Sequence, residues 1–256
     1  MKKSGILALI LICFFSDHSL GQSSFGQPKD SSNFEIKINS DFFLLGTFSD
    51  YMGRFQYIDR ENQIDRYYPY EEPLAGYISN FINNHYLIQP ELKIAESRYS
   101  EIFSSKLASQ LHSKYFNKEG NFIDEKLDTD EKRYSFLLGA YYRYGEQLEG
   151  NIYKIQVANS PKDKQLYEIL KDLESDKIVY KFLRGYRPSS DIFYFVATPR
   201  MIKYFNTIKK EKEELQKSYQ EKLIDKLLEG KKSKEYKKQI DSQQNILLKN
   251  LKLIFD

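Results

Sequence analysis

Few side chains in this sequence could carry acid–base, nucleophilic or metal chemistry. Beyond the first 21 residues the chain has two histidines, His85 and His112, and no cysteine. An imidazole can act as a general base or bind zinc, but a zinc site would need both rings and a carboxylate to meet. A peptidase-type hydrolase with Glu101, His112 and His85 as its site is therefore one hypothesis. The other is a non-catalytic protein in which both histidines flank apolar helix faces.

Sequence motifs of the common enzyme classes are absent. The chain has no glycine-rich nucleotide loop, no HExxH helix and no GxSxG turn. Glu71 and Glu72 could act in glycoside cleavage only with a further carboxylate, because adjacent side chains point apart. The sequence therefore predicts no catalytic residue, no metal site and no cofactor.

The segment from Tyr51 to Glu72 is rich in tyrosine and arginine. Tyrosine offers a rigid ring with a polar tip and arginine a planar donor fork, a combination that suits recognition of a glycan, peptide or protein surface. A second cluster, Tyr141–Gly145, contains Arg143. The alternative is that these rings pack onto the body and the charges pair locally. The predicted ligand-binding residues are Arg54, Tyr57, Asp59, Arg60, Tyr67, Tyr68, Tyr70 and Arg143.

The N-terminus resembles a secretory signal. Lys2 and Lys3 precede an apolar run, Ile6–Phe15, which is too short for a membrane span, and small residues lead up to Gly21. We expect a signal peptide over 1–21, cleaved after Gly21, and a flexible spacer over 22–33. Cys13 lies inside the apolar run after the bulky Ile12, which argues against a lipid anchor. The chain is thus expected to be secreted or periplasmic.

The rest of the chain predicts an α+β body over 34–200. A strand is expected at 34–38, helices near 40–52, 74–86, 99–115 and 129–144, and a long loop over 54–69. A β-α-β-β unit follows, with strands at 152–158, 178–183 and 192–197 and a helix after Ser160-Pro161. The strand at 192–197 is apolar on both faces, which is typical of a central strand. No repeat at solenoid spacing is evident.

The C-terminal segment 201–256 is helical in pattern and basic. From Lys203 onward it has 14 lysines and 9 acidic residues, while the 41% apolar composition of the chain supports a globular body. An apolar seam broken near Gly230 predicts a helical hairpin that closes on itself, on the body or on a second copy. Because glutamates alternate with the lysines, no nucleic-acid partner is expected. A protein or glycan of the cell envelope is the expected partner.

Two stretches, Ile38–Gly46 and Tyr67–Leu74, resemble the opening of an uncharacterised family of exported bacterial proteins. Some members of that family look like zinc peptidases with a His-Glu motif on a later helix. At the corresponding stretch, Tyr99–Lys106, this chain has Glu101 without a neighbouring histidine. The resemblance therefore implies a member that lacks the metal site.

Together these features predict an α+β protein with a mainly helical N-terminal part, a small β-α-β-β unit and a C-terminal helical hairpin. The function expected from the sequence is non-catalytic binding in the envelope or outside the cell, through the Tyr/Arg segment or the hairpin.

Overall fold

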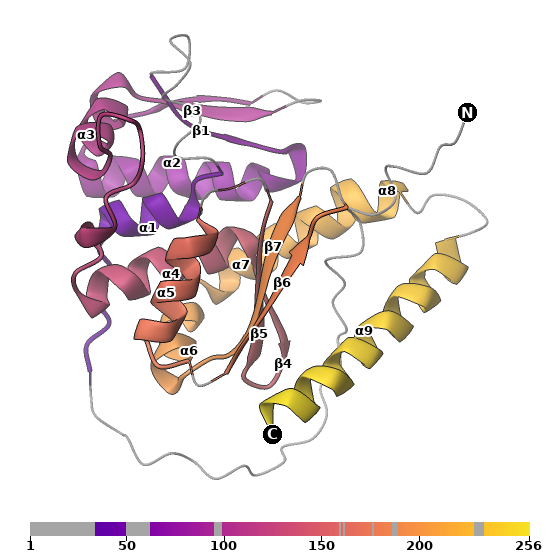
Figure 1. Cartoon of the computed structure of the whole chain (residues 1–256). Helices are drawn as coiled ribbons and strands as arrows, with labels where there is room; N and C mark the ends of the chain where they lie inside the picture. Colours follow the sequence, from indigo (N-terminus) through magenta and orange to yellow (C-terminus); the bar gives the residue numbers. More distant parts are fainter. Residues whose placement is uncertain are drawn as a thin grey trace.

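The computed structural model describes residues 34–49, 62–94, 99–158, 160, 162–175, 177–185, 189–227 and 233–256. Within these ranges the fold is α+β, as the sequence predicted, with two antiparallel sheets (Figure 1). No helix in the described part of the chain is long and apolar enough to cross a membrane.

The described elements form two consecutive repeats followed by a helical extension. The first repeat contains α1 (Ser40–Thr47), β1 (Gln63–Tyr67), the 3-10 turn η4 (Pro69–Glu71), α2 (Glu72–Tyr86), β2 (Glu91–Lys93), β3 (Ser100–Phe103) and α3 (Ser105–Tyr115). After the turn η5 (Asp124–Lys126), the second contains α4 (Asp130–Tyr144), β4 (Gly145–Glu149), β5 (Ile152–Ala158), α5 (Asp163–Asp172), β6 (Ile178–Leu183), β7 (Ser190–Val196) and α6 (Pro199–Asn206). The extension contains α7 (Lys209–Tyr219), the π-helical turn η6 (Gln220–Ile224), α8 (Asp225–Leu227) and α9 (Ser233–Phe255).

The two sheets have matching topologies. The first has the strand order β1-β3-β2 and the second β4-β5-β7-β6, so that β1, β3 and β2 occupy the places of β5, β7 and β6. All of these neighbours pair antiparallel. The position equivalent to β4 falls between α1 and β1, in a stretch outside the described residues. The chain is therefore an internal duplication.

The repeats meet through α1 and α4, which carry the same tetrapeptide, FLLG, at Phe43–Gly46 and Phe136–Gly139. A Cβ atom on Gly46 would lie 2.1 Å from the Phe136 carbonyl oxygen, and one on Gly139 would lie 2.1 Å from the Phe43 carbonyl oxygen. This reciprocal contact places an approximate two-fold axis between the helices. Only glycine allows the backbones to come this close.

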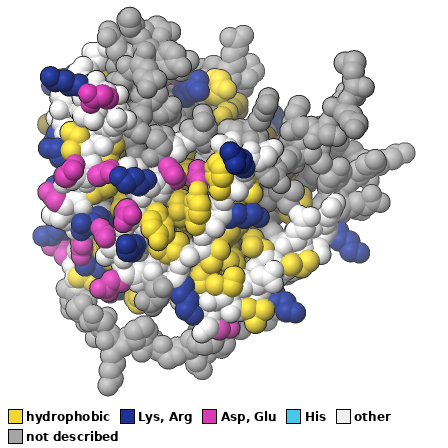
Figure 2. All heavy atoms as spheres, in the orientation of Figure 1, with side chains coloured by type: hydrophobic (Ala, Val, Ile, Leu, Met, Phe, Trp, Pro, Cys, Tyr) yellow, Lys and Arg dark blue, Asp and Glu magenta, His cyan; other side chains and the backbone are white. Residues whose placement is uncertain are grey.

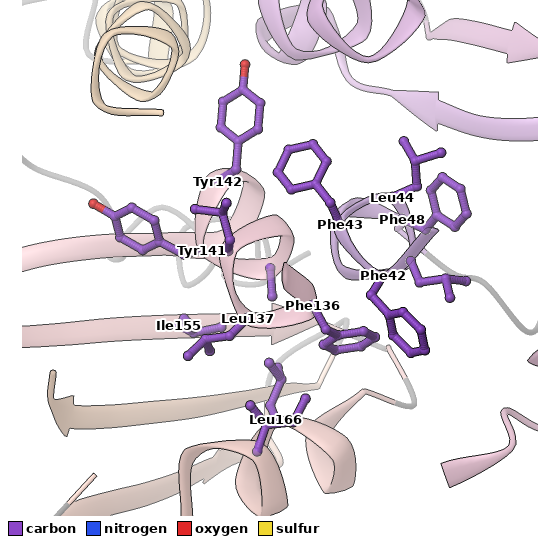
Figure 3. Packing of buried hydrophobic residues seen from close by; sticks show 14 of the residues in the cluster. Phe42, Phe43, Leu44, Phe48, Phe136, Leu137, Tyr141, Tyr142, Ile155 and Leu166 are labelled. Carbon is purple, nitrogen blue, oxygen red and sulfur yellow. The ribbon is translucent and has the colours of Figure 1, made fainter. Parts of the chain in front are cut away.

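The main core surrounds this helix pair. Phe43 of α1 stacks on Tyr142 of α4 with ring centroids 6.4 Å apart. On the other side of α4, Leu137 packs with Ile155 of β5 and Leu166 of α5 (Figure 3). Helix α4 is thus buried between α1 and the second sheet, which explains its apolar residues on several faces.

Several local predictions are confirmed. Thr129 caps α4 by accepting from the Lys132 amide at 3.4 Å, and Thr198 caps α6 by accepting from the Met201 amide at 3.3 Å. Strand β7 is internal to its sheet, as its two apolar faces indicated.

Other local predictions are wrong. Residues 34–38 form no strand, and the expected helix from Tyr99 begins only at Ser105, because Ser100–Phe103 is β3. The expected loop over 54–69 contains β1 in its described part, and β4 was not anticipated. These strands are short and carry charged residues, so they lack the apolar alternation that signals a strand from sequence.

The C-terminal segment does not close along its length as a hairpin. Near its start, Ile240 of α9 packs on Ile224 of η6. Further along, Leu251 packs on Ile152, Ile192 and Tyr194 of the second sheet. Helix α9 therefore crosses from the extension to the second repeat (Figure 1).

Candidate functional site

One face of the first sheet carries mostly polar and charged side chains. We call it the N-terminal sheet face, and it consists of Gln63, Arg66, Glu91, Lys93, Glu101 and Phe103. The strand register pairs Arg66 and Lys93 with Glu101, and Gln63 and Glu91 with Phe103, so all six point to the same side. The opposite side carries Ile102, which is fully buried against the core.

The side chains on this face are ordered by contacts with one another. Arg66 is exposed and its guanidinium carbon lies 5.2 Å from the centroid of the Tyr99 ring. Lys93 is also exposed, with its ammonium 4.4 Å from the Phe103 centroid and 3.5 Å from a Glu91 carboxylate oxygen. Gln63 Nε2 donates to Glu101 Oε1 at 2.7 Å. The face thus presents two cations held over aromatic rings.

A row of tyrosines borders this face. Tyr68 and Tyr99 are 48% and 41% exposed, and their rings lie 5.3 Å apart. Behind them Tyr70 stacks on Tyr68 with an interplanar angle of 8° and contacts Tyr219 of α7 edge-on. The two outer rings can therefore offer both an apolar surface and a hydroxyl to a ligand.

Arg143, predicted to bind a ligand, instead holds the two repeats together. Its guanidinium is buried and donates from Nε and Nη2 to Glu71 at 2.8 and 2.7 Å, and from Nη1 to Asp65 at 2.7 Å. It also donates to the carbonyl oxygens of Thr47 and Arg66. Burial lowers the pKa of Arg143, but the nearby carboxylates outweigh this effect and raise it. The arginine remains charged, and neither carboxylate faces solvent.

A second buried cation lies at the end of α1. Lys162 is fully buried, and its ammonium donates to the carbonyl oxygens of Gly46, at 2.7 Å, and of Phe48. Tyr144 also donates to the Phe48 carbonyl, at 3.0 Å. These donors from the second repeat satisfy the C-terminal carbonyl groups of α1, where the helix dipole favours a positive charge. Sequence reasoning missed Lys162, because a single lysine carries no signal of such a role.

The structure places the other predicted residues as follows. Tyr67 is fully buried, Tyr70 is partly covered between Tyr68 and Tyr219, and Tyr68 is exposed. Burial, with the charge of Glu71, raises the pKa of Tyr70 far above its ordinary value. The predicted ligand residues Arg54, Tyr57, Asp59 and Arg60, the signal segment 1–21 and the spacer 22–33 lie outside the described residues.

The residues considered for a hydrolase have separate partners. The His85 ring stacks on Phe81 at 4.0 Å, with its Nδ1 atom 3.0 Å from the Phe81 carbonyl oxygen. The His112 ring stacks on Phe116 of a different helix, and Glu101 accepts from Gln63. No group of three histidine, cysteine or acidic side chains able to hold a metal ion occurs among the residues that the structure describes.

No protein-family model matches the chain, and no curated protein matches it. Among solved structures, it is similar to I-DmoI in complex with DNA and calcium, at a TM-score of 0.41 and 17% identity, over 66% of this chain and 88% of that one. A structure of mesophilic variants of the homing endonuclease I-DmoI matches at a TM-score of 0.41 and 15% identity, over 66% and 94%. A further I-DmoI variant, in complex with its target DNA, matches at a TM-score of 0.41 and 18% identity, again over 66% and 94%.

These neighbours require a correction of four expectations from the sequence. They are the envelope-binding function, the secretory features, the secreted or periplasmic location and the exclusion of nucleic acid. The solved structures similar to this chain are of a homing endonuclease, in two cases bound to DNA, and not of exported binding proteins. We withdraw the four expectations. The similarity concerns the arrangement of elements and assigns no residue of this chain a role, while the proposed link to an exported family stays a prediction.

Proposed function

We propose that this chain binds double-stranded DNA through the N-terminal sheet face. The observation that supports this proposal is Arg66, an exposed guanidinium held over the Tyr99 ring in an antiparallel sheet face of otherwise largely polar side chains. Antiparallel strands are one of the elements that proteins place in a DNA groove. Arginine donates in a fork to the guanine edge or to phosphate oxygens.

The surroundings of Arg66 fit such a ligand. Lys93 provides a second exposed cation two strands away, on the far side of β3. Tyr68 and Tyr99 are half-exposed at the border, where their hydroxyls can donate to phosphate oxygens and their rings can contact the sugar. The duplex itself has local two-fold symmetry, and this duplicated body shares it approximately.

We extend the proposal to binding and not to strand cleavage. The carboxylates that lie by the end of the helix pair, Asp65 and Glu71, are both bound by Arg143. A divalent cation would need oxygen ligands that are free to coordinate it. These two carboxylates therefore do not fit a metal centre, and we derive no reaction step from them.

Fluorescence anisotropy with a labelled 24-base-pair duplex of mixed sequence tests this proposal. We expect the whole chain to bind at low salt and Arg66→Ala and Lys93→Ala each to weaken binding several-fold to tenfold, with a salt dependence reduced by about one charge per lost phosphate contact. Lys171→Ala, which removes an exposed lysine of α5, is the matched control and should bind like the wild type.

The acidic residues of the face give a test in the opposite direction. Glu91→Gln removes a negative charge beside Lys93 and should strengthen duplex binding, because it removes repulsion of the phosphates. Absence of duplex binding at low salt, or equal binding by the wild type and Arg66→Ala, would overturn the proposal.

A further inference from the structure

The duplication places two equivalent sheet faces on the molecule, and they differ in what they present. The second, which we call the C-terminal sheet face, consists of Glu146, Leu148, Ile152, Lys154, Gln156, Val179, Lys181, Leu183, Ile192 and Tyr194. Cross-strand pairs such as Lys154 with Tyr194 and Lys181 with Ile192 place these residues on one side. The opposite side, with Tyr153, Ile155 and Phe193, faces the main core.

Helix α9 lies on the C-terminal sheet face. Leu251, only 2% exposed, packs on Ile152, Ile192 and Tyr194, and Leu247 and Phe255 pack at the sides of this cluster. Lys252 binds Glu149 at 2.6 Å, and Lys177 donates to the Phe255 carbonyl oxygen at 2.5 Å. Figure 2 shows hydrophobic side chains over the second sheet and next to α9.

The charges on this face are already neutralised within the chain. Lys154 and Glu146 form an ion pair at 2.5 Å, with side chains 7% and 4% exposed. Such a pair is costly to separate, because each charge would be left buried without its partner. On the N-terminal sheet face, by contrast, Arg66 and Lys93 are exposed.

We infer that the chain contacts a duplex through the N-terminal repeat alone and therefore reads a single half-site. This inference rests on the proposed function. A body with two open, symmetric faces would contact two half-sites about 10 base pairs apart. Here the apolar residues of the second face need a cover, and α9 supplies it from the same chain. The fold keeps its two-fold body but retains one ligand face.

Matched charge reversals on the two faces test this inference. Lys181 is exposed on β6 and belongs to the C-terminal sheet face, so it is the counterpart for Arg66. We expect Arg66→Glu to weaken binding of the 24-base-pair duplex by more than tenfold and Lys181→Glu to change it by less than twofold. Circular dichroism and the urea midpoint of each variant check that both remain folded.

A footprint gives a second, independent readout. A duplex recovered by the wild-type chain from a random-sequence library would be cleaved with hydroxyl radicals in the presence of the protein. We expect protection confined to one stretch within a single helical turn. Two protected stretches about 10 base pairs apart, or equal weakening by both charge reversals, would overturn this inference while leaving duplex binding intact. Absence of any duplex binding by the wild type would overturn the proposed function, and this inference with it.

Discussion

At the scale of single residues, Arg143 links elements that are far apart in the sequence. It binds Asp65 of β1 and Glu71 of η4 and reaches the end of α1, so one side chain of the second repeat fixes three points in the first. Replacing it with methionine would leave two carboxylates buried without a counter-charge. We expect Arg143→Met to lower the free energy of unfolding by about 3–5 kcal/mol, measured by urea denaturation.

Arg133→Met on the same helix is the control for this prediction. Arg133 binds Asp130 and Asp172 near the surface, where an ion pair contributes about 1 kcal/mol or less. If the two variants lost the same stability, the buried network would not be the structural link that we describe.

Asp41 is a second residue whose environment predicts a measurable effect. Its carboxylate accepts from Tyr86 at 2.6 Å, from Lys114 at 2.7 Å and from Tyr115. Burial acts to raise the pKa of Asp41, but these donors outweigh it and hold the pKa below its ordinary value. A lowered pKa stabilises the fold above the unfolded pKa of about 3.9, and this contribution disappears as the pH falls through the folded pKa.

We therefore expect Asp41→Asn to be less stable than the wild type at pH 7 and the difference to shrink at pH 3. Urea midpoints of both proteins at the two pH values measure it, with Glu168→Gln, an exposed carboxylate of α5, as the control. A stability difference that is unchanged between pH 7 and pH 3 would contradict the role of the carboxylate charge.

At the scale of elements, the contact between α1 and α4 determines how the repeats join. A methyl group on Gly46 or Gly139 would meet a backbone oxygen of the other helix at 2.1 Å, and a backbone cannot move aside as a side chain can. We expect Gly46→Ala and Gly139→Ala each to destabilise the protein by about 1–3 kcal/mol or more in thermal or urea unfolding, as overpacking does.

Gly76 of α2 supplies the matched control. A Cβ atom there meets nothing within 4 Å, so Gly76→Ala should stabilise the helix by about 0.5–1 kcal/mol. An alanine tolerated equally well at Gly46 and at Gly76 would show that the two helices can separate without cost.

At the scale of the whole molecule, the two repeats share a topology but differ at the surface, because α9 covers only the second. The packing of α9 depends on its inward side chains. Leu251 is 2% exposed against the sheet, whereas Leu253, two residues on, is 71% exposed. We expect Leu251→Asp to destabilise the protein by about 2–5 kcal/mol and to increase binding of a hydrophobic dye to the uncovered face, while Leu253→Asp changes neither. Equal dye binding by the two variants would argue against α9 as the cover.

The sequence alone was sufficient for the locally encoded parts of this fold. The β5-α5-β6-β7 unit follows from apolar strands and turn residues, and Thr129 and Thr198 mark the starts of α4 and α6 through hydroxyl caps on nearby amides. The polar strands β1, β2, β3 and β4 were missed, since each is short and gains its stability from pairing with partners elsewhere in the chain.

Tertiary structure alone decided what these elements do together. The sequence singled out Arg143 as a surface ligand, but its partners lie more than 70 residues away, and no local spacing reports such a contact. The shared FLLG of the two central helices acquires its meaning only when Gly46 and Gly139 meet. The apolar seam of the C-terminal segment was visible, yet whether it closed on itself or on the second sheet depended on long-range packing. Local sequence determines hydrogen bonding within an element, whereas which apolar and charged surfaces meet depends on the whole chain.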